Sequence, residues 1–129
     1  MIPLKTSDQE QIFHYYSKNA KICVVDFFAD WCGPCKKLSV DLEKTLPEEK
    51  TIMEHVFIAD KPTHIPEIEE IKDKIVILKI DIDVKELAEL ASQFKVQSIP
   101  HIIFYKNGKL QQGIARNYKQ ICDCINKLL

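Results

Sequence analysis

The sequence lacks several features that would place it in other classes of protein. Its 129 residues carry 18 basic and 19 acidic side chains, a net charge of −1, so the charge balance favours neither nucleic acid nor an anionic membrane as a partner. No stretch approaches the roughly 20 apolar residues of a membrane span, because Asp26 interrupts the longest apolar run. The N-terminus has no apolar signal-peptide core, and we therefore expect a cytoplasmic protein.

Cysteine occurs five times, an odd number that argues against a framework of structural disulfides in a reducing compartment. A structural zinc site needs four ligands, but the chain has a single Cys-X-X-Cys pair and no His-X3-5-His spacing. We therefore expect no bound metal and no other cofactor. Glycine occurs only three times, and Gly33, Gly108 and Gly113 all lie where the pattern predicts a turn or a close approach of a second backbone.

The residues that are present predict one globular domain spanning residues 1–129, since 46% are hydrophobic and 29% are charged. Two apolar runs, residues 22–29 and 75–82, scarcely alternate and therefore predict strands buried on both faces. Asn107-Gly108 is a strong hairpin signal after a further apolar run. Short strands are expected at residues 2–4 and 102–105, and helices at residues 7–18, 36–46, 83–94 and 117–129.

The most informative stretch is Trp31-Cys32-Gly33-Pro34-Cys35, directly after the first buried run. Two cysteines separated by two residues can close or open a small disulfide, which indicates a redox motif. The attacking species is a thiolate, and a helix N-terminus favours the thiolate over the thiol. We expect Cys32 to lie partly exposed at that positive end and Cys35 to be shielded one turn inside the helix. Pro34 suits the first helical turn, and Gly33 permits close approach of a partner backbone.

With Lys36 added, this motif resembles the active site of the thioredoxin family. The likeness extends to Asp26 in the preceding strand, to Ile99-Pro100 before a later strand and to the Asn107-Gly108 hairpin, and it covers most of the chain. It implies an α/β protein with the thioredoxin fold, a central mixed β-sheet flanked by helices on both faces. It also implies an oxidoreductase, a protein-disulfide reductase of the thioredoxin type.

Asp26 is the exception in its apolar run, and a buried carboxylate is costly unless it is protonated or partnered. One interpretation is a carboxyl with a raised pKa beneath the disulfide, able to exchange a proton with Cys35; the other is a carboxylate that reaches solvent at a strand end. The resemblance implies the first, because Asp26 matches the family's buried aspartate. It also matches Lys79 to a lysine that approaches this aspartate. A paired Lys79 would offset part of the burial cost, whereas an unpaired one would extend to solvent.

The second signature of the family is a proline that is cis and faces the disulfide, and here that residue is Pro100. In the family, the residue before this proline pairs its backbone with an extended substrate. The resemblance therefore implies a substrate-binding surface formed by Trp31, Gly33, Pro34, Ile99, Pro100, Gly113 and Ile114. His101 departs from the threonine or serine that the family usually has next.

Compared with the family, roughly 26 residues are inserted in the second helix, at about residues 40–65. Val40 stands where the family has a kinking proline, and Pro66 resembles the proline that normally makes the kink. We expect residues 51–59 to form a further helical turn or two. The insertion is too short for a core of its own, so we expect an ordered excursion from the second helix rather than a separate domain.

The resemblance implies a specific reaction. Cys32 attacks a substrate disulfide, and Cys35 resolves the mixed disulfide with help from Asp26, leaving an oxidised protein for a thioredoxin reductase to regenerate. The implied roles are electron transport and cell redox homeostasis, with disulfide-containing proteins as substrates and the protein as a monomer. The alternative is a partner-dedicated thioredoxin-fold protein whose insertion docks a specific target, with redox activity secondary.

Overall fold

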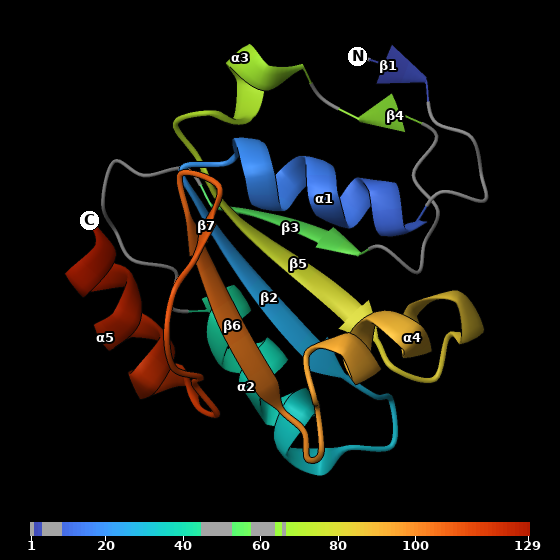
Figure 1. Ribbon diagram of the computed structural model, residues 1–129. Helices are drawn as coiled ribbons and strands as arrows, with labels where there is room; N and C mark the ends of the chain where they lie inside the picture. Colours follow the sequence, from blue (N-terminus) through green and yellow to red (C-terminus); the bar gives the residue numbers. More distant parts are fainter. Residues whose placement is uncertain (1, 4–8, 45–52, 58–63, 66) are drawn as a thin grey trace.

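The computed structural model describes residues 2–3, 9–44, 53–57, 64–65 and 67–129. Figure 1 shows a twisted sheet with helices in front of it and behind it. The elements, in chain order, are β1 Ile2–Pro3, α1 Gln9–Asn19, β2 Ile22–Phe28, α2 Gly33–Lys44, β3 Met53–Phe57, β4 His64–Ile65, α3 Ile68–Ile71, β5 Ile75–Asp81, α4 Lys85–Gln93, β6 His101–Lys106, β7 Lys109–Leu110 and α5 Tyr118–Leu128.

The central sheet of the described chain has the strand order β3-β5-β2-β6-β7. β2 runs parallel to β5, with Ile22 opposite Ile75, and antiparallel to β6, with Ile22 opposite Lys106. β3 is parallel to β5, and β7 is antiparallel to β6. The sheet is therefore mixed, as the resemblance implies. β2 has a hydrogen-bonded neighbour on each edge, β5 and β6, so it lies in the interior of the sheet.

Two apolar layers cover the two faces of the sheet. On one face, Cys23, Val25 and Phe27 of β2 pack with residues of α1 and α4. On the other face, Ile22 and Val24 pack with residues of α2 and α5. Because successive side chains of a strand point to opposite faces, a strand between two helical layers needs apolar residues at nearly every position.

The inserted stretch differs from the sequence prediction. The expected helical turn at residues 51–59 is wrong in its described part, because Met53–Phe57 is strand β3; the remainder lies outside the described residues. β3 pairs with β5 from Met53 opposite Ile75 to Phe57 opposite Lys79. An open strand edge presents unpaired backbone N–H and C=O groups, and β3 satisfies those of β5. The spacing of apolar residues within the insertion contains no information about this distant partner.

The expected first strand is present, but it does not extend the central sheet. β1 pairs antiparallel with β4, with Ile2 opposite Ile65 and Pro3 opposite His64, as a two-stranded sheet. Figure 1 shows this pair above α1, while β3 lies at the edge of the central sheet. The inserted stretch therefore contributes strands to both sheets.

The hairpin between β6 and β7 turns at Asn107 and Gly108, whose φ angles are 50° and 83°. Two successive positive φ angles are typical of the turn that Asn-Gly favours. A Cβ atom at Gly108 would lie 3.0 Å from the carbonyl oxygen of Lys18, so a side chain there would also make a tight contact with α1. No helix in the described part of the chain is long and apolar enough to cross a membrane.

Candidate active site

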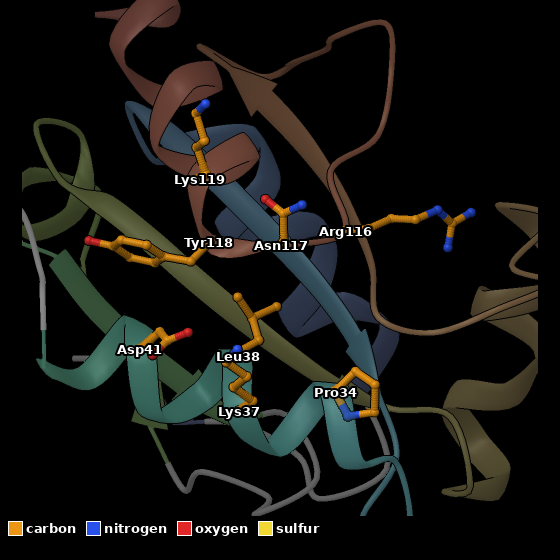
Figure 2. Close-up of a pocket in the computed structure, with 8 residues that line it drawn as sticks. All are labelled: Pro34, Lys37, Leu38, Asp41, Arg116, Asn117, Tyr118 and Lys119. Carbon is orange, nitrogen blue, oxygen red and sulfur yellow. The ribbon is translucent and has the colours of Figure 1, made fainter.

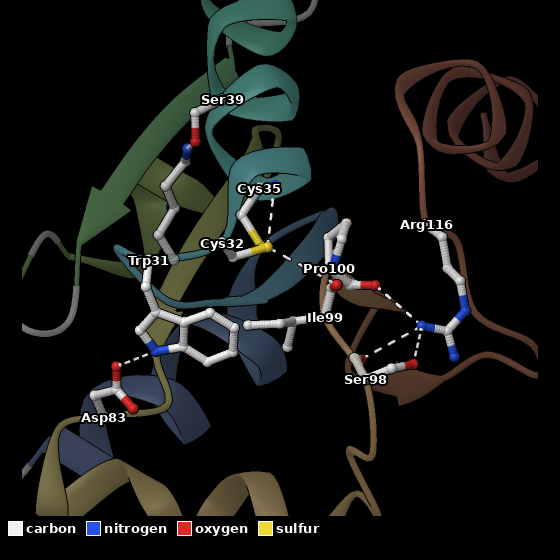
Figure 3. Close-up of a disulfide and its surroundings, with 10 residues drawn as sticks. Trp31, Cys32, Cys35, Ser39, Asp83, Ser98, Ile99, Pro100 and Arg116 are labelled. Atoms are coloured by element: carbon white, nitrogen blue, oxygen red, sulfur yellow. Dashed lines mark hydrogen bonds between the residues drawn. A yellow bond between two sulfur atoms is a disulfide. The ribbon is translucent and has the colours of Figure 1, made fainter.

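Cys32 and Cys35 form a disulfide at the N-terminal end of α2, with their Cα atoms 5.2 Å apart (Figure 3). α2 begins at Gly33, so Cys32 directly precedes the helix and Cys35 lies in its first turn. Pro34 fits this first turn because the amide that it lacks would have no partner within the helix. The motif thus occupies the strand-to-helix position that the sequence predicts.

The Cys32 sulfur atom accepts a hydrogen bond from the backbone at the start of α2. The backbone N–H of Cys35 donates to Cys32 Sγ over 3.2 Å, and the N–H of Lys36 donates to the Cys32 carbonyl oxygen over 3.2 Å. Together with the positive end of α2, the N–H of Cys35 stabilises negative charge on the Cys32 sulfur once the disulfide opens.

The exposed fraction, in contrast, does not distinguish the cysteines: it is 5% for Cys32 and 3% for Cys35. The expectation of a partly exposed Cys32 is therefore wrong for this oxidised form. The Ile99 carbonyl oxygen lies 3.8 Å from Cys32 Sγ, so the loop before β6 covers the sulfur.

This loop contains the second signature of the family. The Ile99–Pro100 peptide bond is cis, Pro100 is buried and Ile99 is partly exposed. The contact between Ile99 and Cys32 joins residues 67 positions apart in the sequence. The structure therefore brings together the two signatures on which the resemblance is based.

Trp31 lies on one side of the disulfide and is 68% exposed. Its Nε1 atom donates to Asp83 Oδ2 over 2.8 Å, which holds the ring against the loop between β5 and α4. A shallow hollow beside it is lined by Trp31, Ile82, Val96, Gln97, Ser98 and Ile99. Gly33 and Pro34 are exposed as well, so this part of the predicted substrate-binding surface is open to a partner.

On the opposite side of the disulfide lies Arg116, which the sequence analysis missed. Its Nη1 atom donates to Ser98 Oγ over 2.8 Å, to the Pro100 carbonyl over 3.3 Å and to the Ser98 carbonyl over 3.4 Å. Figure 3 shows Trp31 and Arg116 on either side of the disulfide and the cis-proline loop. No local motif marks Arg116, because the residues that it contacts are 16 and 18 positions away.

The same segment contains Gly113 and Ile114, both of which are exposed. Ala115 pairs with Ile102 in an antiparallel bridge, through hydrogen bonds of 2.9 and 3.0 Å. In such a pair, Arg116 lies toward Pro100, whereas Ile114 and Gly113 lie progressively further from it. Arg116 is therefore the residue of this segment that the structure brings to the cis-proline.

Asp26 is 2% exposed and points to the same face of β2 as Val24, the face covered by α2. Burial raises its pKa from the usual value near 3.8 to about 6, and the opposing charge of Lys79 partly counteracts this rise. Among the described residues, Asp26 Oδ1 has no hydrogen-bond partner. The structure thus excludes the plainer alternative of a carboxylate that reaches solvent at the strand end.

Lys79 is directly opposite Asp26 in the parallel pair of β2 and β5, and it is 1% exposed. Its ammonium group donates to Ser39 Oγ over 2.5 Å, so the side chain points toward α2 and does not extend to solvent. A hollow of about 280 Å³ is lined by Phe28, Ala29, Asp30, Cys35, Lys36, Ser39 and Lys79. Lys79 and Cys35 therefore border the same space.

His101 follows the cis-proline and is buried, with its ring 5.9 Å from that of Phe27. Burial, and secondarily the charge of Arg116, lower the pKa of His101 below its usual value. Its Nδ1 atom has no hydrogen-bond partner among the described residues. The imidazole is therefore neutral at pH 7 and packs as part of the core.

The other cysteines lie away from the disulfide. Cys23 is buried in β2, and burial raises the pKa of its thiol, whereas Cys122 and Cys124 are partly exposed on α5. In the described part of the chain, no group of three or more histidine, cysteine, aspartate or glutamate side chains is arranged to hold a metal ion.

Comparisons with known proteins agree with this geometry. Residues 9–128 match a family model described as a thioredoxin-like domain. The chain is 34% identical to the thioredoxin of Rickettsia typhi over 107 residues, which are 81% of this chain and 78% of that protein. It is 31% identical to the thioredoxin of Echinococcus granulosus over 91 residues, 70% of this chain; that match spans 62% of the relative's length, less than two thirds.

The fold is also similar to that of solved structures. The oxidised thioredoxin of Plasmodium falciparum superposes with a TM-score of 0.58 over 98% of this chain and 97% of that chain. The two sequences are 24% identical, so this likeness concerns the fold.

Proposed function

Because this chain belongs to the thioredoxin-like family of thiol–disulfide oxidoreductases, we propose that it reduces disulfide bonds in proteins through a Cys32/Cys35 dithiol–disulfide cycle. The observation that carries the proposal is the Cys32–Cys35 disulfide at the start of α2, in contact with the loop of the cis-proline. The similarity to thioredoxins favours this function over that of a docking protein whose redox activity is secondary.

The cycle begins with the reduced protein. The Cys32 thiolate attacks one sulfur of the substrate disulfide, and the other substrate sulfur leaves as a thiolate that takes a proton from solvent. The Cys35 thiolate then attacks Cys32 Sγ in the mixed disulfide, which releases the second substrate thiolate and forms the Cys32–Cys35 disulfide. Two electrons pass from the protein to the substrate. The positive end of α2 and the Cys35 N–H support Cys32 as the attacking residue.

Resolution requires that Cys35 first lose its proton, and we assign the acceptor role to Asp26. With a pKa of about 6, this carboxyl is mostly ionised at pH 7, yet it is a far better base than an ordinary aspartate. The hollow beside Cys35 and Lys79 is large enough for water, which would link the thiol to the buried Asp26–Lys79 pair. Lys79, which is held by its hydrogen bond to Ser39, lies opposite Asp26, and its charge lowers the pKa that burial alone would give to Asp26.

Substrate binds across the surface that Trp31, Gly33, Pro34 and Ile99 form around the disulfide. An extended segment beside Ile99 would pair with its backbone, as a strand adds to an open edge. The exposed Trp31 ring supplies apolar contact at one end of this surface. We retain Gly113 and Ile114 only as outer parts of the binding surface, since Arg116 lies closer to the cis-proline.

The proposed substrates are proteins that contain disulfide bonds, and the proposed electron donor is a thioredoxin reductase. In this role the protein acts as a cytoplasmic monomer in electron transport and cell redox homeostasis. The net charge of −1 agrees with a protein that binds neither nucleic acid nor anionic membrane.

Reduction of insulin disulfides tests the function, with NADPH and a thioredoxin reductase as the source of electrons. The wild type is expected to turn over continuously, and Cys32→Ser to be inactive. Cys122→Ser is the matched control, because Cys122 lies on α5 away from the site, and it should retain full activity. Equal activity of Cys32→Ser and the wild type would contradict the proposal.

A further inference from the structure

The charged groups nearest the disulfide differ in sign on its two sides: carboxylates flank Trp31, whereas Arg116 lies on the other side. Trp31 is flanked by the exposed carboxylates of Asp30 and Asp83, with Asp81 partly exposed behind them. Two cations, the exposed Lys36 and the buried Lys79, border the same hollow as Asp30, and Lys85 follows at the start of α4. The two charged groups next to the indole ring itself are both carboxylates: Asp83 accepts its hydrogen bond, and Asp30 precedes it in the chain.

The opposite side contains a groove between α2 and the start of α5. It has a volume of about 360 Å³ and is lined by Pro34, Lys37, Leu38, Asp41, Arg116, Asn117, Tyr118 and Lys119. Three of these residues are cationic and one is anionic. Figure 2 shows that Pro34 of the redox motif lies at one end of the groove, and that the Arg116 side chain extends from it. The groove is thus continuous with the active site and has a positive charge.

Arg116 joins this groove to the cis-proline loop. All three of its hydrogen bonds to Ser98 and Pro100 come from a single nitrogen, Nη1. Its Nε and Nη2 atoms have no hydrogen-bond partner in the described part of the chain, and Figure 3 shows them pointing away from the loop. The guanidinium group is therefore held by Nη1, and the edge formed by Nε and Nη2 remains open with two N–H donors. Such an edge matches the two oxygens of a carboxylate.

We propose that Arg116 determines specificity by binding a carboxylate side chain of the substrate, next to the segment that pairs with Ile99. Further acidic residues of the substrate continue into the groove beside Lys37 and Lys119, and basic residues lie on the other side, near Asp30 and Asp83. The inference rests on the proposed disulfide reduction and adds to it the order of charges around the substrate cysteine. Complementary charges of this kind fix register and suppress wrong partners.

Two isomeric peptides test this order. Each has one cysteine in a mixed disulfide with a chromogenic thiol; one has two glutamates before the cysteine and two lysines after it, and the other has the reverse. Because composition and net charge are the same, long-range attraction is the same for both. For the reduced wild type, we expect the second-order rate constants for the two peptides to differ by at least about fivefold. Salt at 0.5 M should reduce the ratio, since screening weakens exposed charge pairs.

The variants identify the residues responsible. Arg116→Gln is expected to bring the ratio of the two rate constants close to one, and Arg116→Lys to retain part of it. Asp83→Asn should lower the ratio as well, while its amide oxygen still accepts the Trp31 hydrogen bond. Lys109→Gln, on the distant β7, is the control and should keep the wild-type ratio.

Equal rate constants for the two isomers in a wild type that reduces insulin would overturn the charge assignment and leave the proposed function intact. An Arg116→Gln variant that slows both peptides by the same factor would likewise overturn it, because that result indicates a role confined to holding the loop. Failure of the wild type to reduce insulin would overturn the proposed function, and this inference with it.

Discussion

Asp26 and Lys79 lie opposite each other on two adjacent parallel strands, and both are almost completely buried. Attraction between the two charges does not fully compensate the cost of burying the carboxylate. Burial is the larger influence on the pKa of Asp26, and it raises this pKa to about 6. A buried pair of this kind contributes little to stability, and its retention in a sheet core is better explained by its chemistry.

The pKa of Asp26 makes stability depend on pH in a defined direction. Between pH 4 and 6, the folded protein holds a proton on Asp26 that the unfolded chain has lost, so stability falls as the pH rises and becomes level above about 6. The difference from the usual value near 3.8 corresponds to about 3 kcal/mol. Asp26→Asn is therefore expected to raise the free energy of unfolding by about 1–3 kcal/mol at pH 8 and to change it little at pH 4.

Urea denaturation at the two pH values measures this effect. Asp123→Asn, an exposed position on α5, is the control and should follow the wild type at both. A loss of stability at pH 8 in Asp26→Asn would show that the charged pair stabilises the fold.

The same variant separates catalysis from folding. Without a proton acceptor, Asp26→Asn is expected to release substrate from the mixed disulfide about 10-fold or more slowly than the wild type at pH 8. The ratio of the two rates should approach one at pH 5, where the wild-type carboxyl is protonated as well. Stopped-flow measurement of the second substrate thiol follows this step. A ratio that stays constant across the pH range would exclude Asp26 as the acceptor.

Ser39 provides a hydrogen bond to the buried ammonium group of Lys79. Ser39→Ala is expected to lower the free energy of unfolding by about 1–3 kcal/mol, the usual cost of leaving a buried charged group with one partner fewer. Ser92→Ala, at an exposed position of α4, is the matched control and should change stability by less than about 0.5 kcal/mol. Equal unfolding midpoints for the two variants would mean that another group replaces the hydroxyl.

The two cysteines are distinguished by trapping. Cys35→Ser is expected to accumulate mixed disulfides with substrate proteins, because the attacking Cys32 remains and the resolving thiol is gone. Cys32→Ser should trap none, since the N–H of Cys35 and the positive end of α2 stabilise a thiolate at Cys32 and not at Cys35. Non-reducing electrophoresis after incubation with insulin compares the two. Equal trapping by both variants would contradict the assignment of Cys32 as the attacking residue and Cys35 as the resolving residue.

Removal of the insertion tests the position of β3. Joining Ser39 to Pro66 deletes β3, β4 and the end of α2, including the buried Leu42. The shortened chain is expected to unfold at lower urea concentration or to aggregate, because the edge of β5 loses its partner. Leu42→Ala alone should cost about 2–5 kcal/mol and keep the fold, which separates the loss of this buried side chain from the loss of the strands. A shortened chain as stable as the wild type would show that β3 does not support the sheet.

Motifs with a fixed chemical purpose were predictable from the sequence. Cys32, Cys35 and Pro100 lie together as the resemblance implies, and the buried strands at residues 22–29 and 75–82 follow from their uninterrupted apolar character. The register that places Lys79 opposite Asp26 also agrees with the family pattern. In each case the determining information is local or contained in a short motif.

The features that sequence reasoning missed depend on contacts between distant parts of the chain. Arg116 has no motif of its own, and its role comes from hydrogen bonds to Ser98 and Pro100. Met53–Phe57 has apolar spacing that fits a helix, but the open edge of β5 makes it a strand. Cys32 is covered by the loop of Ile99, which the linear motif does not indicate.

The position of β2 has a consequence for hydrogen exchange. This strand is hydrogen-bonded along both edges and covered on both faces, so its amide hydrogens are released to deuterated solvent only when the whole sheet opens. A carboxyl proton on Asp26 therefore cannot reach solvent by local fraying of its own strand. It has to travel through the side chains and the hollow beside Cys35, so proton transfer during turnover does not require β2 to separate from its neighbouring strands.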